Sequence, residues 1–431
     1  MFLFGKMREG WPPTWIIPVW YAAGAVSLGL VLPRIEARFL PGQTASISSA
    51  SAMAMYSCIA AGMITLTGIV FSLVFVMVQF SATAYSPRLV LWMARDPPLF
   101  HSIGVFTATF LYAIAAMAWV DREGSGKVPF FSAWLVVVLL LASVGVFIRL
   151  VHSLNRLQIS NVLAFTGNFA RKSIDVMYPP LGRPYVLAGA AEMAQLPVTQ
   201  SMFHHGAPQA IQFLDIPLLT ALAERVNGVI EMRSAVGDTV VTTTPILRVH
   251  GGRQPIEERD LKKAIRMGTQ RTFEQDPKYA VQLLRDIAIR ALSPAVNDPT
   301  TAVQALDQIE DFLLRLGRRL LEVGEVRDHS GRLRLVFPVP SWEDFLDLAF
   351  SEIRSYGRES MQVMRRMKAL LSDLIDALPK ERAPALRSQQ RRLDSAISRS
   401  FPDVEDQLEA SAEDREGMGA TRKARSRKIS S

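Results

Sequence analysis

Four long apolar runs lie before residue 152, and they constrain the fold more than any other feature of the sequence. A bilayer core is about 30 Å thick, so a helix that crosses it needs roughly 20 mainly apolar residues. None of the four runs contains Asp, Glu or Lys. We therefore predict an integral membrane protein whose spans are residues 15–32, 52–80, 103–120 and 130–151.

The flanks of these spans predict how the chain lies in the membrane. Cytoplasmic flanks carry an excess of Lys and Arg. With the N-terminus in the cytoplasm, the outer loops hold Arg34, Arg38, Arg122 and Lys127. The inner flanks then hold the larger set, which is Lys6, Arg8, Arg88, Arg95, Arg149, Arg156, Arg171 and Lys172. We therefore expect a multi-pass protein of the inner (plasma) membrane with both termini in the cytoplasm.

The second predicted span carries a polar stripe. Its small and polar residues recur at intervals that keep them on one helical face, and they include Gly62, Thr65, Ser72 and Gln79. One interpretation is that Thr65, Ser72 and Gln79 line a wetted pathway. The other is helix packing, in which small residues allow close approach and hydroxyl groups bond across helices. The sequence leaves both interpretations open.

The chain changes character after the fourth span, because most of its charge lies there. We predict an α-helical membrane protein with four transmembrane helices and a mixed α+β soluble C-terminal region. The expected parts are a transmembrane domain at 1–154, an amphipathic connecting helix at 155–183, a small β-rich module at 184–255, a mainly helical soluble domain at 256–400 and a disordered charged tail at 401–431.

Several helices of the soluble region have recognisable starts. Asp276-Pro277 and Asp298-Pro299 each combine a capping residue with proline at the first helical position. Ser341 precedes another amphipathic run. The apolar residues between Leu261 and Met267 also have the spacing of one helix.

Three motifs resemble those of a known family. Ser86-Pro87-Arg88-Leu89 follows the second span, residues 271–277 read RTFEQDP, and residues 286–302 read DIAIRALSPAVNDPTTA. Together with the four spans, they resemble a family of predicted bacterial membrane proteins that is catalogued only as a domain of unknown function. The resemblance implies this architecture and a membrane location, and it implies no activity.

The best candidate site is the break between two predicted helices near residue 295. Its polar residues are Arg271, Asp276, Asp286, Arg290, Ser293, Asn297, Asp298 and Thr300. They could form a polar ligand site or a contact between subunits. The alternative is a structural corner, in which Asn297 and Asp298 cap backbone amides and Pro299 fixes the geometry.

The sequence contains no recognisable catalytic constellation. No histidine pair has helical metal-ligand spacing, and there is no glycine-rich phosphate loop or nucleophile elbow. The short strands around Gly237-Asp238 resemble part of a lipoyl carrier domain, but residues 231–234 contain no lysine to hold a covalent cofactor. We therefore predict that the protein is not an enzyme and has no metal and no cofactor.

Two classes of function fit this sequence. The first is an oligomeric channel or transporter with the second span lining the path, in which the partners are the lipid bilayer and further copies of the chain. The second is a membrane-anchored sensor or scaffold whose soluble half binds a ligand or partner. The formal charge of +8 fits an anionic membrane surface, and we expect no nucleic-acid partner.

Overall fold

The computed structural model describes residues 16–40, 44–84, 97–121, 127–154, 159–181 and 189–419. The chain folds into two compact units, residues 1–158 and 159–431. The Ser86-Pro87-Arg88-Leu89 motif lies outside the described residues, and so does the basic end of the tail at 420–431.

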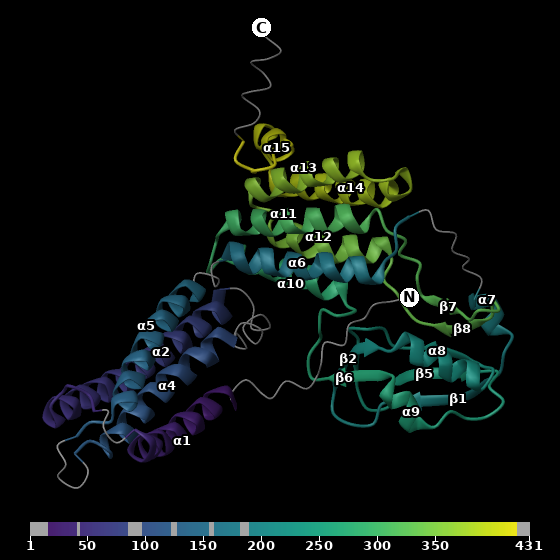
Figure 1. The fold of residues 1–431 in the computed structure, drawn as a ribbon. Helices are drawn as coiled ribbons and strands as arrows, with labels where there is room; N and C mark the ends of the chain where they lie inside the picture. Colours follow the sequence, from purple (N-terminus) through teal and green to yellow (C-terminus); the bar gives the residue numbers. More distant parts are fainter. Residues whose placement is uncertain are drawn as a thin grey trace. The chain divides into compact units, whose positions relative to one another are not determined.

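Within its described residues, the first unit contains four helices that are long and apolar enough to cross a bilayer, so the prediction of four spans is confirmed (Figure 1). They are α1 (Ile16–Phe39), α2 (Ser49–Ala84), α4 (Pro97–Met117) and α5 (Phe130–Leu154). Helices of this kind require a lipid bilayer around them, because exposed apolar surface of this extent is unfavourable in water.

Helix α4 is the centre of the first unit. It packs against α1, α2 and α5, and its apolar stretch is 44% buried, against 11–22% for the other three. Glycine allows the close contact with α1: a β carbon on Gly29 would lie 2.5 Å from Cβ of Ala115, and one on Gly104 would lie 2.6 Å from Cδ2 of Tyr21. Close approach through small residues is the usual way in which apolar helices associate in lipid.

Helix α1 continues past its predicted end at residue 32. It passes through Pro33 and reaches Phe39, and Glu36 is buried although it is acidic. The Glu36 carboxylate accepts hydrogen bonds from the backbone N–H of Phe131 at 2.5 Å, and from the N–H and hydroxyl of Ser132 at 3.2 and 3.0 Å. These donors lie in the first turn of α5, where a negative charge is favourable. The extra turns of α1 therefore place the Glu36 carboxylate where it caps the N-terminus of α5.

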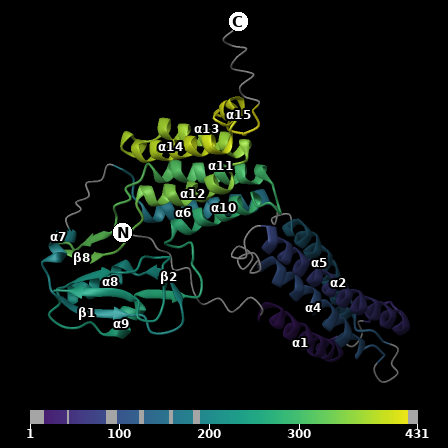
Figure 2. The ribbon, with the colours of Figure 1, turned by 180° about the vertical axis from the view of Figure 1, so that it is seen from behind.

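The second unit contains a stack of paired helices. Figure 1 and Figure 2 show three layers, which hold α6 and α10, α11 and α12, and α13 and α14. Helix α11 packs on α6, α10 and α13, whereas α12 packs on α10 and α14. Their bounds are α6 (Ile159–Met177), α10 (Pro277–Ala291), α11 (Pro299–Leu316), α12 (Trp342–Tyr356), α13 (Met361–Ala377) and α14 (Ala383–Ser400). A short turn, η3 (Lys380–Arg382), precedes α14. Each long helix buries one apolar stripe, as in Leu284, Ile287 and Ala288 of α10.

The remainder of the second unit is a β-rich module with two sheets. One sheet has the order β1-β5-β3-β8-β7, in which β3 and β8 are parallel and the other neighbours antiparallel; the second has the antiparallel order β4-β2-β6. The strands are β1 (Val198–Phe203), β2 (Gln209–Leu214), β3 (Val229–Met232), β4 (Thr239–Val240), β5 (Pro245–His250), β6 (Ile265–Gly268), β7 (Glu325–Arg327) and β8 (Leu333–Val336). The short helices are α7 (Gly189–Ala194), α8 (Ile216–Arg225) and α9 (Glu258–Lys263).

Two segments of the second unit also differ from the sequence-based prediction. The run expected to form one helix around residues 261–267 divides into α9 and strand β6, because β6 hydrogen-bonds to β2. Part of the tail expected to be disordered contains α15 (Val404–Ala410), which packs on α13 and α14 and buries Ala410 completely. In both cases a partner far away in the sequence stabilises a conformation that the local pattern does not predict.

Candidate functional site

The half-buried Arg271 forms an ion pair with the buried Asp276 at the start of α10. Nε and one terminal nitrogen of Arg271 lie 2.7 and 2.6 Å from Oδ2 of Asp276, and the guanidinium also donates to Gln282 at 2.6 Å. Asp276 is the N-cap of α10, since its carboxylate accepts from the N–H of Tyr279 at 3.1 Å. Burial raises the pKa of Asp276, while the charge of Arg271 opposes this rise. The pair therefore supports the helix start.

The same segment joins the helices to the β-rich module. The side chain of Gln275 exchanges two hydrogen bonds with the backbone of Leu214 at the end of β2, at 2.8 and 3.0 Å. Phe273 is buried and stacks on Phe169 of α6, with ring centroids 5.1 Å apart. The RTFEQDP motif is thus a joint between β2, α6 and α10.

The helix break after α10 is a capped corner. Asp298 accepts a hydrogen bond from the N–H of Thr301 at 3.1 Å and another from its hydroxyl at 2.6 Å, and Pro299 is the first helical residue of α11. Asn297 has a φ of +47°, and its N–H donates to the carbonyl oxygen of Ser293 at 2.8 Å. The hydroxyl of Ser293 donates to the carbonyl oxygen of Arg290. These contacts satisfy backbone groups at the corner.

The structure does not bring all the candidate residues of this region together. Asp276 begins α10 and Ser293 follows its end, so α10 separates them by about 25 Å, at 1.5 Å for each residue. Asp286 lies between them and accepts from Arg285 at 2.8 Å. Thr300 is exposed, and Arg290 is half-buried in the last turn of α10. The predicted set therefore divides into a joint at one end of α10 and a corner at the other.

The candidate pathway residues of α2 face away from the other three helices of their unit. Ala52, Tyr56, Ala60, Met63 and Val70 form the buried face of α2, which packs mainly on α4. At about 100° for each residue, the stripe is centred about 170° from that face. Its members Thr65, Ser72 and Gln79 are all exposed in the single chain.

Two buried tyrosines in the first unit were not singled out from the sequence. Tyr56 of α2 and Tyr112 of α4 belong to the same apolar cluster and are 1% and 0% exposed. Among the described residues, neither hydroxyl has a hydrogen-bond partner. Buried polar side-chain atoms usually have a hydrogen-bond partner, so the packing of α2 on α4, which the sequence does not show, identifies this pair as unusual.

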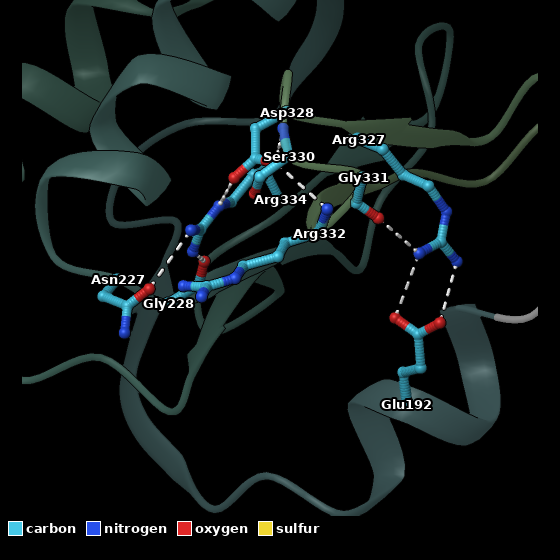
Figure 3. Close-up of polar contacts among 9 residues, drawn as sticks. All are labelled: Glu192, Asn227, Gly228, Arg327, Asp328, Ser330, Gly331, Arg332 and Arg334. Atoms are coloured by element: carbon cyan, nitrogen blue, oxygen red, sulfur yellow. Dashed lines mark hydrogen bonds and ion pairs between the residues drawn. The ribbon is translucent and has the colours of Figure 1, made fainter.

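A second polar cluster in the soluble unit also escaped the sequence analysis. Figure 3 shows Asp328 in the β7–β8 turn, where it accepts from Ser330, from the N–H of Arg332 and from Nε of Arg334 at 2.8 Å. Arg334 is buried and donates onward to the carbonyl oxygen of Gly228 and the side chain of Asn227. The hydroxyl of Ser330 and the guanidinium of Arg334 hold the pKa of Asp328 well below its usual range. This cluster ties the hairpin to the turn after α8.

Among the described residues, no three His, Cys, Asp or Glu side chains lie together as a metal site would require. That the protein has no cofactor stays a prediction.

Comparison with known proteins identifies the family of the chain. It is 27% identical over 410 residues to uncharacterised proteins of Mycobacterium bovis and Mycobacterium tuberculosis, and the alignment covers 91% of this chain and 77% of each relative. No solved structure matches the chain. The model of the family described as "Predicted membrane protein (DUF2254)" matches residues 12–373, and the chain belongs to this family of multi-pass membrane proteins.

Proposed function

We propose that the protein is an oligomeric membrane channel or transporter in which α2 of each copy lines the path. The observation that carries this proposal is the position of the polar stripe, which lies on the face of α2 that α4 leaves uncovered. Polar side chains in a span favour the interior of a bundle or a water-filled cavity over lipid. A second copy of the chain supplies such a surrounding.

The small residues of α2 support the same arrangement. A β carbon on Gly62 or Gly68 would meet no atom within 4 Å, so both glycines leave open space on the exposed side of the helix. Open glycines on a span are the usual contact points between helices in lipid. The hydroxyl of Thr65 donates to the carbonyl oxygen of Ala61 within α2. The hydroxyl proton therefore has an acceptor even without a contact between copies of the chain.

The single cysteine provides a direct test of the contact between copies. Cys58 is exposed on α2, four residues before Gly62, and therefore lies on the same side as the stripe. Oxidative cross-linking of the unmodified protein in native membranes should give a covalent dimer. The matched control is a variant that combines Cys58→Ser with Met53→Cys. Met53 is 43% exposed, but it lies about 140° around the helix from Cys58 and therefore on another face of α2. Equal cross-linking of both proteins would contradict an α2 contact.

Ion flux into proteoliposomes tests the path itself. Ser72→Leu and Gln79→Leu should each reduce flux, because leucine removes a polar group from the stripe. Phe71→Leu is the control, since Phe71 is exposed on another side of α2. Absence of flux through the unmodified protein, or equal flux through all variants, would contradict the channel proposal.

The orientation is part of the same proposal. The excess of Lys and Arg on the inner flanks supports cytoplasmic termini. A reporter fused to the C-terminus and one inserted at residues 124–126 should report opposite sides of the membrane. Reporters on the same side would overturn this topology.

The sensor or scaffold function remains the second candidate. The observation in its favour is the extent of the second unit, which runs from residue 159 to 431 and has its own layered core. Ligand-dependent stabilisation of the full chain, without any flux, would favour this candidate.

A further inference from the structure

A basic pocket lies between α12 and α14 in the second unit. Its volume is about 310 Å³, and its lining residues are Arg354, Ser388, Arg391, Arg392, Ser395 and Arg399. The α14 residues recur at intervals of three and four, so they share one face of that helix. Five of the six residues follow residue 373, where the family match ends, so the family assignment says nothing about this pocket.

The pocket holds more positive than negative charge. Asp347 of α12 accepts from Arg392 at 2.9 Å and from the amide of Gln389 at 2.7 Å. Gln389 in turn accepts from Arg354 at 2.9 Å, so a neutral amide and not a carboxylate orients this guanidinium. The lining thus contains four guanidinium groups, and the Asp347 carboxylate pairs with one of them, that of Arg392.

Arg354 is half-buried, whereas the other three arginines of the pocket are exposed. Burial and the nearby charge of Arg392 lower the pKa of Arg354, as does the charge of Arg399, while Asp347 opposes the shift. Like charges held this close repel one another, and a bound anion relieves that repulsion. The fold maintains the arrangement because α12 and α14 pack together, and α14 buries Leu386 and Leu393.

We propose that this basic pocket binds a phosphate-bearing anion. Guanidinium groups match phosphate oxygens with two parallel N–H donors, and the hydroxyls of Ser388 and Ser395 add further donors on the same face. The pocket volume is at the lower end of the range for small-molecule sites, which suits a phosphate or diphosphate group with a small body. The proposal is independent of any path along α2.

Calorimetric titration of inorganic pyrophosphate into the full chain in neutral detergent tests this proposal. The unmodified protein should bind with saturation, and added salt should weaken the binding. Arg391→Ala with Arg399→Ala should weaken it about tenfold or more, since each charge-assisted hydrogen bond to phosphate is a strong one. Arg387→Ala is the control, because Arg387 is exposed on α14 and does not line the pocket.

Two further measurements complete the test. Replacing Arg391 and Arg399 by lysine keeps the charge and removes the planar guanidinium group. The affinity of this variant should therefore lie between that of the unmodified protein and that of the double alanine variant. Short-chain phosphatidylglycerol distinguishes a lipid headgroup from a free phosphate compound: binding of the lipid alone assigns the pocket to a headgroup, and binding of both assigns it to the phosphate group itself. The proposal is overturned if neither probe binds, if the double alanine variant binds like the unmodified protein, or if Arg387→Ala weakens binding equally.

Discussion

Gly237 and Asp276 approach so closely that no side chain fits between them. A β carbon on Gly237 would lie 2.4 Å from Oδ2 of Asp276 and 2.8 Å from a terminal nitrogen of Arg271. Gly237 also has a φ of +92°, which L side chains rarely adopt. The turn before β4 therefore rests directly on the ion pair that begins α10.

This contact predicts that Gly237→Ala destabilises the soluble unit. The left-handed backbone alone should cost about 1–3 kcal/mol, and the clash with Asp276 should add to that loss. Gly331→Ala is the matched control, because Gly331 has a φ of +80° but open space around it. Chemical unfolding of the full chain in detergent measures the loss of unfolding free energy in both variants. Equal losses for the two variants would show that the contact between Gly237 and Asp276 contributes nothing.

The cap of α11 gives a second prediction. Asp298→Ala should lose about 0.5–2 kcal/mol of unfolding free energy, because the N–H of Thr301 loses its acceptor. Asp298→Asn should keep most of that stability, since asparagine also caps helices. Thermal unfolding of the three proteins provides the comparison. Equal stability of the aspartate, asparagine and alanine forms would refute the capping role.

The docking of α15, within the tail that the sequence predicts to be disordered, gives a third prediction. Arg365 pairs with Glu409 at 2.7 Å, Arg415 pairs with Asp373 at 2.9 Å, and Ala410 is fully buried. Truncation after Pro402 should cost about 1–2 kcal/mol, since exposed ion pairs contribute only about 0.2–1 kcal/mol each. Truncation after Gly419 keeps all these contacts and is the control. Identical melting of both truncated proteins would mean that α15 adds no stability.

Glu231 should make the stability of the soluble unit depend on pH. Burial favours a raised pKa, but hydrogen bonds from Arg233 and His250 outweigh it, so the pKa of Glu231 lies below its usual 4.5. A depressed carboxyl pKa contributes stability that is present above pH 4.5 and is lost as the pH falls through the folded-state value. Glu231→Gln should therefore reduce the loss of melting temperature below about pH 4.5. An unchanged acid profile in this variant would contradict the assignment.

Local signals account for the features that could be read from the sequence. The four spans depend only on the length and apolarity of each run, so the sequence predicts them without knowledge of their neighbours. The caps at Asp276, Asp298 and Ser341 depend on hydrogen bonds within three residues, and the structure contains all three. The family motifs are equally local, because each is a continuous stretch of chain.

Only the tertiary structure decided which distant residues meet. Residues 265–268 have a helical pattern of apolar positions but form β6, because β2 offers hydrogen-bond partners more than fifty residues earlier. The stripe on α2 is visible in the sequence, whereas its uncovered position depends on how α4 packs. Arg354 and Arg399 are likewise ordinary basic residues until α12 and α14 bring them to one pocket. Periodicity determines the face of a helix on which a residue lies. Which element packs against that face depends on packing across the whole unit.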